Sequence, residues 1–255
     1  MRPLIAGNWK MHGLKADLDE IDSIAALAAS TQPHVDILIC PPASLLAAAA
    51  WTAAGRIAVG GQDCSPEVSG AHTGDISAEM LKDAGAGAVI VGHSERRQHH
   101  GETDSLVSRK ALAARRAGLL AVLCVGETQE QHASGAALSI CGDQIVASVP
   151  LGMSASGLAI GYEPLWAIGS GQVPTSHEIV QMHAHIRRCL VQHLGAEGKN
   201  VRILYGGSVK PSNARAILAL PEVGGALVGG ASLKSEEFVA IFASAPHEGA
   251  TIAAE

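Results

Sequence analysis

Three reactive side chains, Lys10, His93 and Glu163, stand where short apolar runs of the sequence end. A carboxylate at such a place is a candidate general base, because burial raises the pKa of a carboxyl group toward the working range. A lysine there requires an anion, since a buried ammonium without a partner has lost its hydration. A helix that starts beside a histidine disfavours the charged imidazole. Together these groups fit proton transfer next to a carbonyl group.

Each of these residues also has a purely structural interpretation. Lys10 could lie on the surface beside a turn that Asn8 caps. His93 could be a packed core histidine, and Glu163 could be a solvated carboxylate at a strand end. The charged residues that directly follow His93, and the apolar stretch Leu165–Ile168 after Glu163, favour a functional interpretation, because a surface loop without a function is usually polar.

Two glycine-rich loops, YGGSVKPSN and LVGGASL, each precede an expected helix. Glycine lets the backbone approach a ligand closely, and consecutive N–H groups at a helix start bind phosphate. The groups concerned are Gly206, Gly207 and Ser208 in the first loop, and Gly229 and Gly230 in the second. Either loop alone could reflect a turn requirement, but the two together indicate a phosphate site.

A third loop has the composition of a lid. Pro164, Gly169 and Gly171 bracket an apolar stretch directly after Glu163, as expected of a hinged segment that closes over a small site. With the base, the lysine, the histidine and the phosphate loops, this predicts an enzyme acting on a small phosphorylated carbonyl compound.

Short apolar runs alternate along the chain with longer alanine-rich segments. This pattern predicts parallel strands covered by helices, and these elements must position the groups described above. The expected strands are 4–9, 35–40, 57–62, 88–92, 119–125, 158–163, 201–205 and 225–228. The expected helices include 16–29, 44–54, 77–84, 105–117, 175–194 and 212–218. Eight strands in about 250 residues favour a closed (β/α)8 barrel. No linker divides the chain, so residues 1–255 are expected to form a single barrel domain with a flexible tail from about Ala245.

Composition excludes several classes of protein. The 255 residues are 47% hydrophobic, which is enough for a sizeable core. The formal net charge of −6 argues against a nucleic-acid or anionic-membrane partner. No run approaches the ~20 apolar residues that span a bilayer, and the N-terminus has no signal-peptide core. These features predict a soluble, cytoplasmic protein.

Metal and cofactor sites are not indicated. The five cysteines lie far apart with no CxxC pair, so neither a disulfide framework nor a zinc site is expected. His99 with His100, and His183 with His185, do not share a helix face as paired metal ligands would. The basic run Arg109–Arg116 is interpreted as the solvated face of a helix.

Six motifs, in order, resemble the triosephosphate isomerase family. They are GNWKM at 7–11, VGHSERR at 91–97, CVGET at 124–128, YEPLWAIGSG at 162–171, YGGSV at 205–209 and LVGGASL at 227–233. The similarity covers nearly the whole chain, from about Leu4 to about Phe242. It implies a TIM barrel that interconverts dihydroxyacetone phosphate and D-glyceraldehyde 3-phosphate through an enediolate, in glycolysis and gluconeogenesis, without a cofactor or metal.

The resemblance also implies roles for particular residues. Glu163 would move the proton, His93 would act as a neutral electrophile, and Lys10 would supply positive charge. This family is itself the standard example of a catalytic histidine kept neutral by a helix start. The other implied residues are Asn8 for substrate orientation, Glu95 and Cys124 as supports, and Gly169, Ser208, Gly229 and Gly230 for phosphate binding.

A homodimer is implied as well, in which the loop containing Thr73 reaches into the partner. This sequence departs from the family pattern around that contact: His12 replaces a common Asn, His72 an aromatic residue and Asp75 a usual Glu. Gly161 replaces a usual Ala in the strand before the base. The first three differences bear on the interface, and the fourth on the rigidity of that strand.

Two other functions compete with this one. An isomerase acting on a larger sugar phosphate would use a similar phosphate site, but the compact lid favours a small substrate. A non-catalytic barrel that serves as a scaffold would be expected to have lost one of Lys10, His93 and Glu163, and all three are present.

Overall fold

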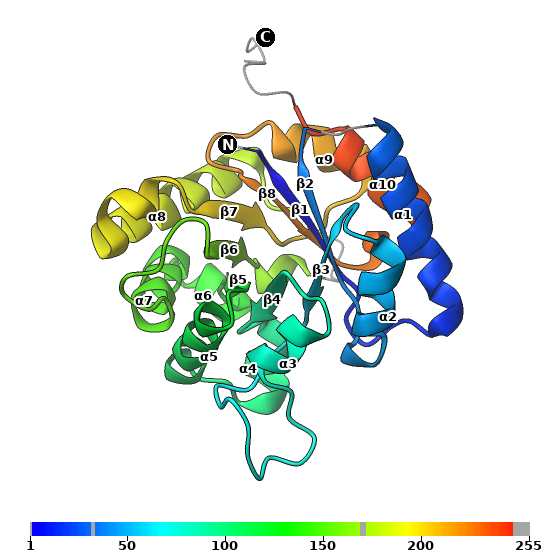
Figure 1. The fold of residues 1–255 in the computed structure, drawn as a ribbon. Helices are drawn as coiled ribbons and strands as arrows, with labels where there is room; N and C mark the ends of the chain where they lie inside the picture. The colour runs from blue at the N-terminus through cyan, green and yellow to red at the C-terminus, as the bar shows by residue number, and fades with distance from the viewer. Residues whose placement is uncertain (1, 32–33, 169–171, 247–255) are drawn as a thin grey trace.

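Eight parallel strands close into a barrel with helices around it (Figure 1). The computed structural model describes residues 2–31, 34–168 and 172–246. The strands pair in chain order, and β8 pairs with β1 to close the barrel. They are β1 Leu4–Asn8, β2 Asp36–Cys40, β3 Ala58–Gly61, β4 Ala88–Val91, β5 Leu120–Val125, β6 Leu158–Tyr162, β7 Arg202–Tyr205 and β8 Gly225–Val228. The predicted (β/α)8 barrel is confirmed, and each predicted strand overlaps an observed one.

Helices cover the outer face of this barrel (Figure 1). The helices in the predicted segments are α1 Leu18–Thr31, α2 Ala43–Ala53, α3 Ala78–Asp83, α5 Asp104–Arg116, α8 Ser176–Leu194 and α9 Pro211–Leu218. The others are α4 Ser94–His100, α6 Gln129–Ala133, α7 Ala137–Ser148 and α10 Ser235–Ala243. Short 3-10 turns are η1 Lys15–Asp17, η2 Leu165–Ala167, η3 Gly195–Lys199 and η4 Gly230–Ser232.

Three helices carry weak sequence signals. α6 has only 5 residues, too few to show a 3.6-residue period. α7 and α10 begin without a side-chain hydrogen bond to the helix start, so their N-termini lack the usual capping residue. In contrast, α5 and α8 are capped by the threonines that precede them. The hydroxyls of Thr103 and Thr175 accept from the backbone N–H groups of Leu106 and Glu178.

The strands bury both faces. One face fills the barrel with a cluster drawn from every strand except β3, including Leu4, Ile90 and Leu204. The other face packs against the helices in a larger cluster that includes Ile5, Val89 and Ile203. Because both faces are buried, the strands read as continuous apolar runs rather than as alternating ones.

Part of the basic run on α5 is not solvated. Lys110 is 4% exposed, and its ammonium lies 2.5 Å from Glu102 Oε1 and 2.6 Å from Asp63 Oδ1. The interpretation of Arg109–Arg116 as one solvated helix face is therefore wrong at Lys110, which tertiary packing turns inward.

The end of the described chain packs against the start of β2. Ala245 is 4% exposed, and its carbonyl oxygen lies 2.7 Å from His34 Nε2. Most of the tail predicted from Ala245, residues 247–255, lies outside the described residues. Among the described helices, none is long and apolar enough to cross a membrane.

Candidate active site

A cavity of about 610 Å³ opens at the carboxyl ends of the strands. Its lining includes Asn8, Lys10, His93, Glu163, Ile168, Gly206, Gly207, Ser208, Gly229 and Gly230. The fold thus brings together predicted residues from β1, β4, β6, β7 and β8, which are far apart in the sequence. A larger cavity of about 1170 Å³ opens at the opposite ends of the strands, beside Leu4 and Leu120, and contains none of these residues.

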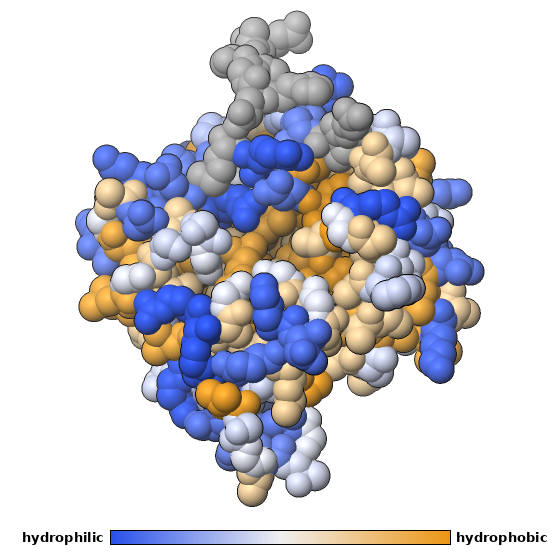
Figure 2. Space-filling model, in the orientation of Figure 1, coloured by the Kyte–Doolittle hydropathy of each residue, from blue (hydrophilic) through white to orange (hydrophobic). Residues whose placement is uncertain are grey.

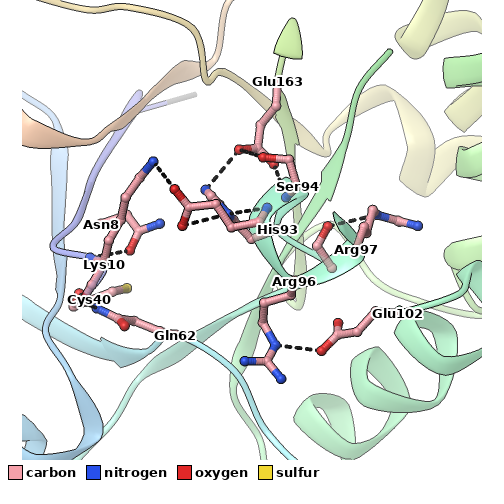
Figure 3. Close-up of polar contacts among 12 residues, drawn as sticks. Asn8, Lys10, Cys40, Gln62, His93, Ser94, Arg96, Arg97, Glu102 and Glu163 are labelled. Carbon is pink, nitrogen blue, oxygen red and sulfur yellow. Dashed lines mark hydrogen bonds and ion pairs between the residues drawn. The ribbon is translucent and has the colours of Figure 1, made fainter. Parts of the chain in front are cut away.

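Glu163 directly follows β6 and is 2% exposed (Figure 3). Its Oε2 accepts the backbone N–H of Ser94 at 2.9 Å, and its Oε1 accepts the Ser94 hydroxyl at 3.1 Å. His93 Nε2 lies 2.9 Å from the same Oε1. Burial alone would raise the pKa of Glu163, but the contacts with His93 and Ser94 stabilise the carboxylate and hold the pKa below its ordinary value. In this conformation, burial therefore does not raise the pKa as the sequence suggested.

His93 caps the start of α4 and is 6% exposed. Its Nδ1 accepts the backbone N–H of Glu95 at 3.2 Å, so this nitrogen carries no proton. The ring proton of the neutral form must then be on Nε2, which faces Glu163 and the cavity (Figure 3).

Lys10 lies just beyond β1, and its ammonium is 2.6 Å from Glu95 Oε1. The backbone at Lys10 has φ 54°, a left-handed conformation that costs free energy in a residue other than glycine. Two side chains hold it there: Asn8 Oδ1 accepts the Lys10 N–H at 3.0 Å, and the Gln62 amide donates to the Lys10 carbonyl at 2.8 Å. Lys10 is thus a positioned cation rather than a solvated surface residue.

Cys124 on β5 lies inside the barrel, where burial and, secondarily, the charge of Glu163 raise the pKa of its thiol well above the ordinary value. It therefore supports the base as an apolar neighbour and not as a nucleophile. On the adjacent strand, a β-carbon at Gly161 would lie 3.2 Å from Cys124 Sγ and 3.2 Å from Leu227 Cδ2. Both neighbours thus pack closely against Gly161, the residue two positions before the base.

The two glycine-rich loops lie side by side across the cavity from His93. At Gly206, a side chain would collide with the Tyr162 carbonyl at 2.8 Å, and at Gly207 it would overlap the Tyr205 hydroxyl. Only glycine therefore lets the first loop cross so close to β6 and β7. The Ser208 carbonyl accepts from the Asn213 amide at 3.0 Å, which fixes this loop to α9.

The second loop carries Gly229 and Gly230 from β8 into η4. Its shape is set by the Ser232 hydroxyl, which donates to the Gly229 carbonyl at 2.7 Å. The N–H groups of both loops belong to segments that lead into helices, the geometry that favours an anion. The last predicted phosphate residue, Gly169, lies outside the described residues.

Three residues that support the site were not assigned a role from sequence: Ser94, Gln62 and Glu127. Ser94 and Glu127 lie within the motifs VGHSERR and CVGET, so their neighbourhood carried a signal, whereas Gln62 simply ends a predicted strand. Glu127 is fully buried and accepts from Trp166 Nε1 at 2.7 Å and from the Tyr162 hydroxyl at 3.1 Å. It ties the described part of the lid to β6.

Thr73 lies away from this cluster, in the exposed loop between β3 and α3 that projects from the barrel (Figure 1). His72 and Asp75, two of the departures from the family pattern, are exposed in the same loop, and the third, His12, is exposed after β1. The space-filling view shows hydrophobic as well as hydrophilic side chains on this projection (Figure 2).

The fold and this cluster together define the class of protein, a (β/α)8-barrel isomerase. The sequence pattern described as triosephosphate isomerase matches residues 3–245, so the chain belongs to the triosephosphate isomerase family. It is 56% identical over 249 residues to the triosephosphate isomerase of Rhodopseudomonas palustris strain BisA53, covering 96% of this chain and 98% of that one.

Other relatives agree. The triosephosphate isomerase of Afipia carboxidovorans is 57% identical over 247 residues, with 96% of this chain and 98% of the relative covered. The crystal structure of triosephosphate isomerase from Bartonella henselae superposes with a TM-score of 0.90 at 46% identity, covering 96% of this chain and 99% of that one.

Proposed function

We propose that this protein interconverts dihydroxyacetone phosphate and D-glyceraldehyde 3-phosphate, with Glu163 as the base. The observation that carries the proposal is the buried Glu163 carboxylate, which lies 2.9 Å from an imidazole nitrogen of His93 in a cavity that two glycine-rich loops line. A base beside a neutral hydrogen-bond donor is what proton transfer next to a carbonyl group requires.

The reaction consists of two proton transfers. Glu163 leaves its hydrogen bonds with Ser94 and removes a proton from the substrate carbon that bears the hydroxyl group. The electrons of that C–H bond form the carbon–carbon double bond of an enediolate, and the carbonyl oxygen takes the negative charge. The same carboxyl group then returns the proton to the neighbouring carbon, while a proton moves between the two oxygens, so that atoms and charge balance.

The developing oxyanion is stabilised by two groups. His93 donates its Nε2–H to the substrate oxygens as a neutral electrophile, and Lys10 supplies positive charge, while Asn8 orients the substrate. Glu95 supports both, because its carboxylate holds the Lys10 ammonium and its N–H holds His93 Nδ1.

The phosphate group is bound by backbone N–H groups. In this proposal, Ser208, Gly229, Gly230 and Gly169 provide them. Closure of residues 164–171 excludes water from the cavity, which protects the enediolate from loss of phosphate. Cys124 packs beneath the base as a support. The proposal needs no metal or cofactor.

We infer a cytoplasmic enzyme of glycolysis and gluconeogenesis that folds as one domain and works as a homodimer. The dimer is supported by exposed hydrophobic side chains: Met11 is 95% exposed and Leu14 76% in the segment after β1, and Val68 is 50% exposed in the projecting loop. Such side chains suit an interface. Thr73 would enter the partner subunit close to its Lys10.

An isomerase assay with D-glyceraldehyde 3-phosphate tests the proposal, with a larger sugar phosphate assayed in parallel. Turnover of the triose phosphate alone is expected. Turnover of the larger sugar phosphate alone would point to the rival isomerase, and no turnover of either would point to a scaffold. Sedimentation across protein concentrations tests the homodimer, which a persistent monomer would contradict.

A further inference from the structure

Two charged side chains lie at the edge of the cavity outside the reacting groups. Lys210 immediately precedes α9 and Glu237 lies in the first turn of α10; both are exposed and both line the cavity. They sit on the side of the two glycine-rich loops. A phosphorylated substrate would therefore enter past one cation and one anion.

Neither charge is neutralised within the described residues. No ion pair involves Lys210 or Glu237 in the parts of the chain that the structure covers, although both line one cavity. The other lysines near the site are paired: the Lys10 ammonium lies 2.6 Å from Glu95, and the Lys234 ammonium lies 2.9 Å from Glu20. The charges of Lys210 and Glu237 are therefore not compensated by a neighbouring side chain in the described part of the chain.

The backbone at Lys210 is fixed while its side chain remains free. Its N–H donates to Asn213 Oδ1 at 2.8 Å, and its carbonyl accepts from the Ala214 N–H at 2.9 Å. Pro211 follows at the first position of α9, where its ring restricts the chain. The flexible lysine stem therefore extends from a rigid point at the cavity edge.

This placement matters because the protein as a whole repels the substrate. The chain has a formal net charge of −6, and a phosphate monoester is an anion. Lys10 cannot attract it strongly from a distance, since Glu95 balances most of its charge. Enzymes of this family are a standard example of turnover limited by encounter with substrate, so a local field can set the rate.

We propose that Lys210 and Glu237 form an opposed pair that sets the rate of substrate capture. Lys210 draws the anionic phosphate group toward the glycine-rich loops, and Glu237 opposes its entry. Neither side chain touches the reacting atoms. The inference rests on the proposed triose phosphate isomerase activity and adds to it the residues that govern selection of anionic substrates.

The test measures kcat and kcat/KM for D-glyceraldehyde 3-phosphate at ionic strengths of about 0.01 M and about 0.5 M. Lys210→Gln should lower kcat/KM about three- to tenfold at the low ionic strength and less than about twofold at the high one. Its kcat should stay within about twofold. Glu237→Gln should raise kcat/KM at low ionic strength by about two- to threefold, because it removes the opposing charge.

Two matched variants control for net charge. Lys199→Gln removes an exposed cation at the end of η3, before β7 and so at the opposite end of the barrel. Glu236→Gln removes the exposed carboxylate next to Glu237, which does not line the cavity. Both should change kcat/KM less than about twofold at either ionic strength. Lys210→Arg keeps the charge and should retain the wild-type salt dependence, which separates charge from folding.

A Lys210→Gln enzyme with the salt dependence of the wild type would overturn the capture proposal. So would an equal loss in Lys199→Gln, or a loss confined to kcat. These outcomes leave the isomerase activity standing. Absence of turnover in the wild type would instead overturn the proposed function itself.

Discussion

Two clusters of charged side chains include residues of α4 or next to it, and they differ in the groups that pair with their carboxylates. Figure 3 shows the first of them, with Arg96 and Glu102 of the second nearby. The pocket cluster consists of Lys10, His93, Glu95 and Glu163. The outer cluster consists of Asp63, Arg96, Glu102 and Lys110, with two cations and two anions joined by contacts of 2.5 to 2.9 Å. Helix α4 contributes to both clusters: Glu95 belongs to the pocket cluster and Arg96 to the outer cluster.

The two clusters differ in the groups that hold their carboxylates. Glu102 accepts from Lys110 and from Arg96 through Oε1, and these bonds outweigh burial and lower the pKa of its carboxyl group. Its Oε2 is buried and has no hydrogen-bond partner among the described residues. In the pocket cluster, the bonds that hold Glu163 come from Ser94 and His93 and can be exchanged for a substrate. We therefore expect the outer cluster to contribute to stability and the pocket cluster to contribute to catalysis.

The largest expected effect is on stability. Lys110→Met leaves Glu102 and Asp63 with one cation between them and should lower the free energy of unfolding by about 3–5 kcal/mol. Urea denaturation at a fixed protein concentration measures it. The control is Arg109→Met on the same helix, whose side chain is 57% exposed and should change stability by less than about 0.5 kcal/mol. Equal effects of the two would mean that the outer cluster is not a stabilising one.

The next effect is on catalysis. Glu163→Asp withdraws the carboxylate by one methylene group and should lower kcat by roughly 10²-fold or more, because proton transfer depends on position. The free energy of unfolding should change far less than in Lys110→Met. Steady-state kinetics with D-glyceraldehyde 3-phosphate measure the rate. Near-normal turnover would remove Glu163 from the role of base.

Two buried histidines, His93 and His183, extend this comparison to pH dependence. His93 lines the cavity and contacts Glu163, whereas His183 is buried away from it and burial lowers the pKa of its ring to about 4. An unfolded histidine takes up a proton near pH 6.5, so between pH 6.5 and pH 4 the unfolded chain binds the proton that the folded chain refuses. Stability should therefore fall as the pH falls through this window, by up to about 3 kcal/mol.

Chemical denaturation at several pH values measures this contribution. His183→Gln should lose that part of the pH dependence, whatever its absolute stability. The exposed His177 on the same helix provides the control, and His177→Gln should keep the wild-type slope. If His183→Gln keeps the slope instead, another buried group causes it.

The smallest effect is expected at Gly161. Gly161→Ala places a methyl group 3.2 Å from Cys124 Sγ and Leu227 Cδ2, so the neighbours must shift by a few tenths of an ångström. Stability should change by less than about 1 kcal/mol and kcat by less than about threefold. Gly87→Ala, where a β-carbon meets nothing within 4 Å, is the control. A large loss of kcat in Gly161→Ala alone would show that the close packing of Gly161 against Cys124 and Leu227 is needed to position Glu163.

The sequence by itself determined the barrel and brought the candidate reacting groups to one end of it. Strands buried on both faces leave a continuous apolar pattern, and parallel strands bring Lys10, His93 and Glu163 to one end because their carboxyl ends must meet there. Glycine pairs mark the two loops at the cavity, because a side chain at Gly206 or Gly207 would collide with β6 or β7. These signals are local, so a single sequence carries them.

Only the tertiary structure decided the partners of each charge. Nothing in the spacing of the basic run shows that Lys110 turns inward to Glu102, or that Gln62 holds the left-handed backbone at Lys10. The direction of the Glu163 pKa depends on His93 and Ser94, which are far away in the chain, because their contacts with the carboxylate outweigh burial there. Local pattern determines which strand end bears a reactive group; long-range contacts determine its charge state.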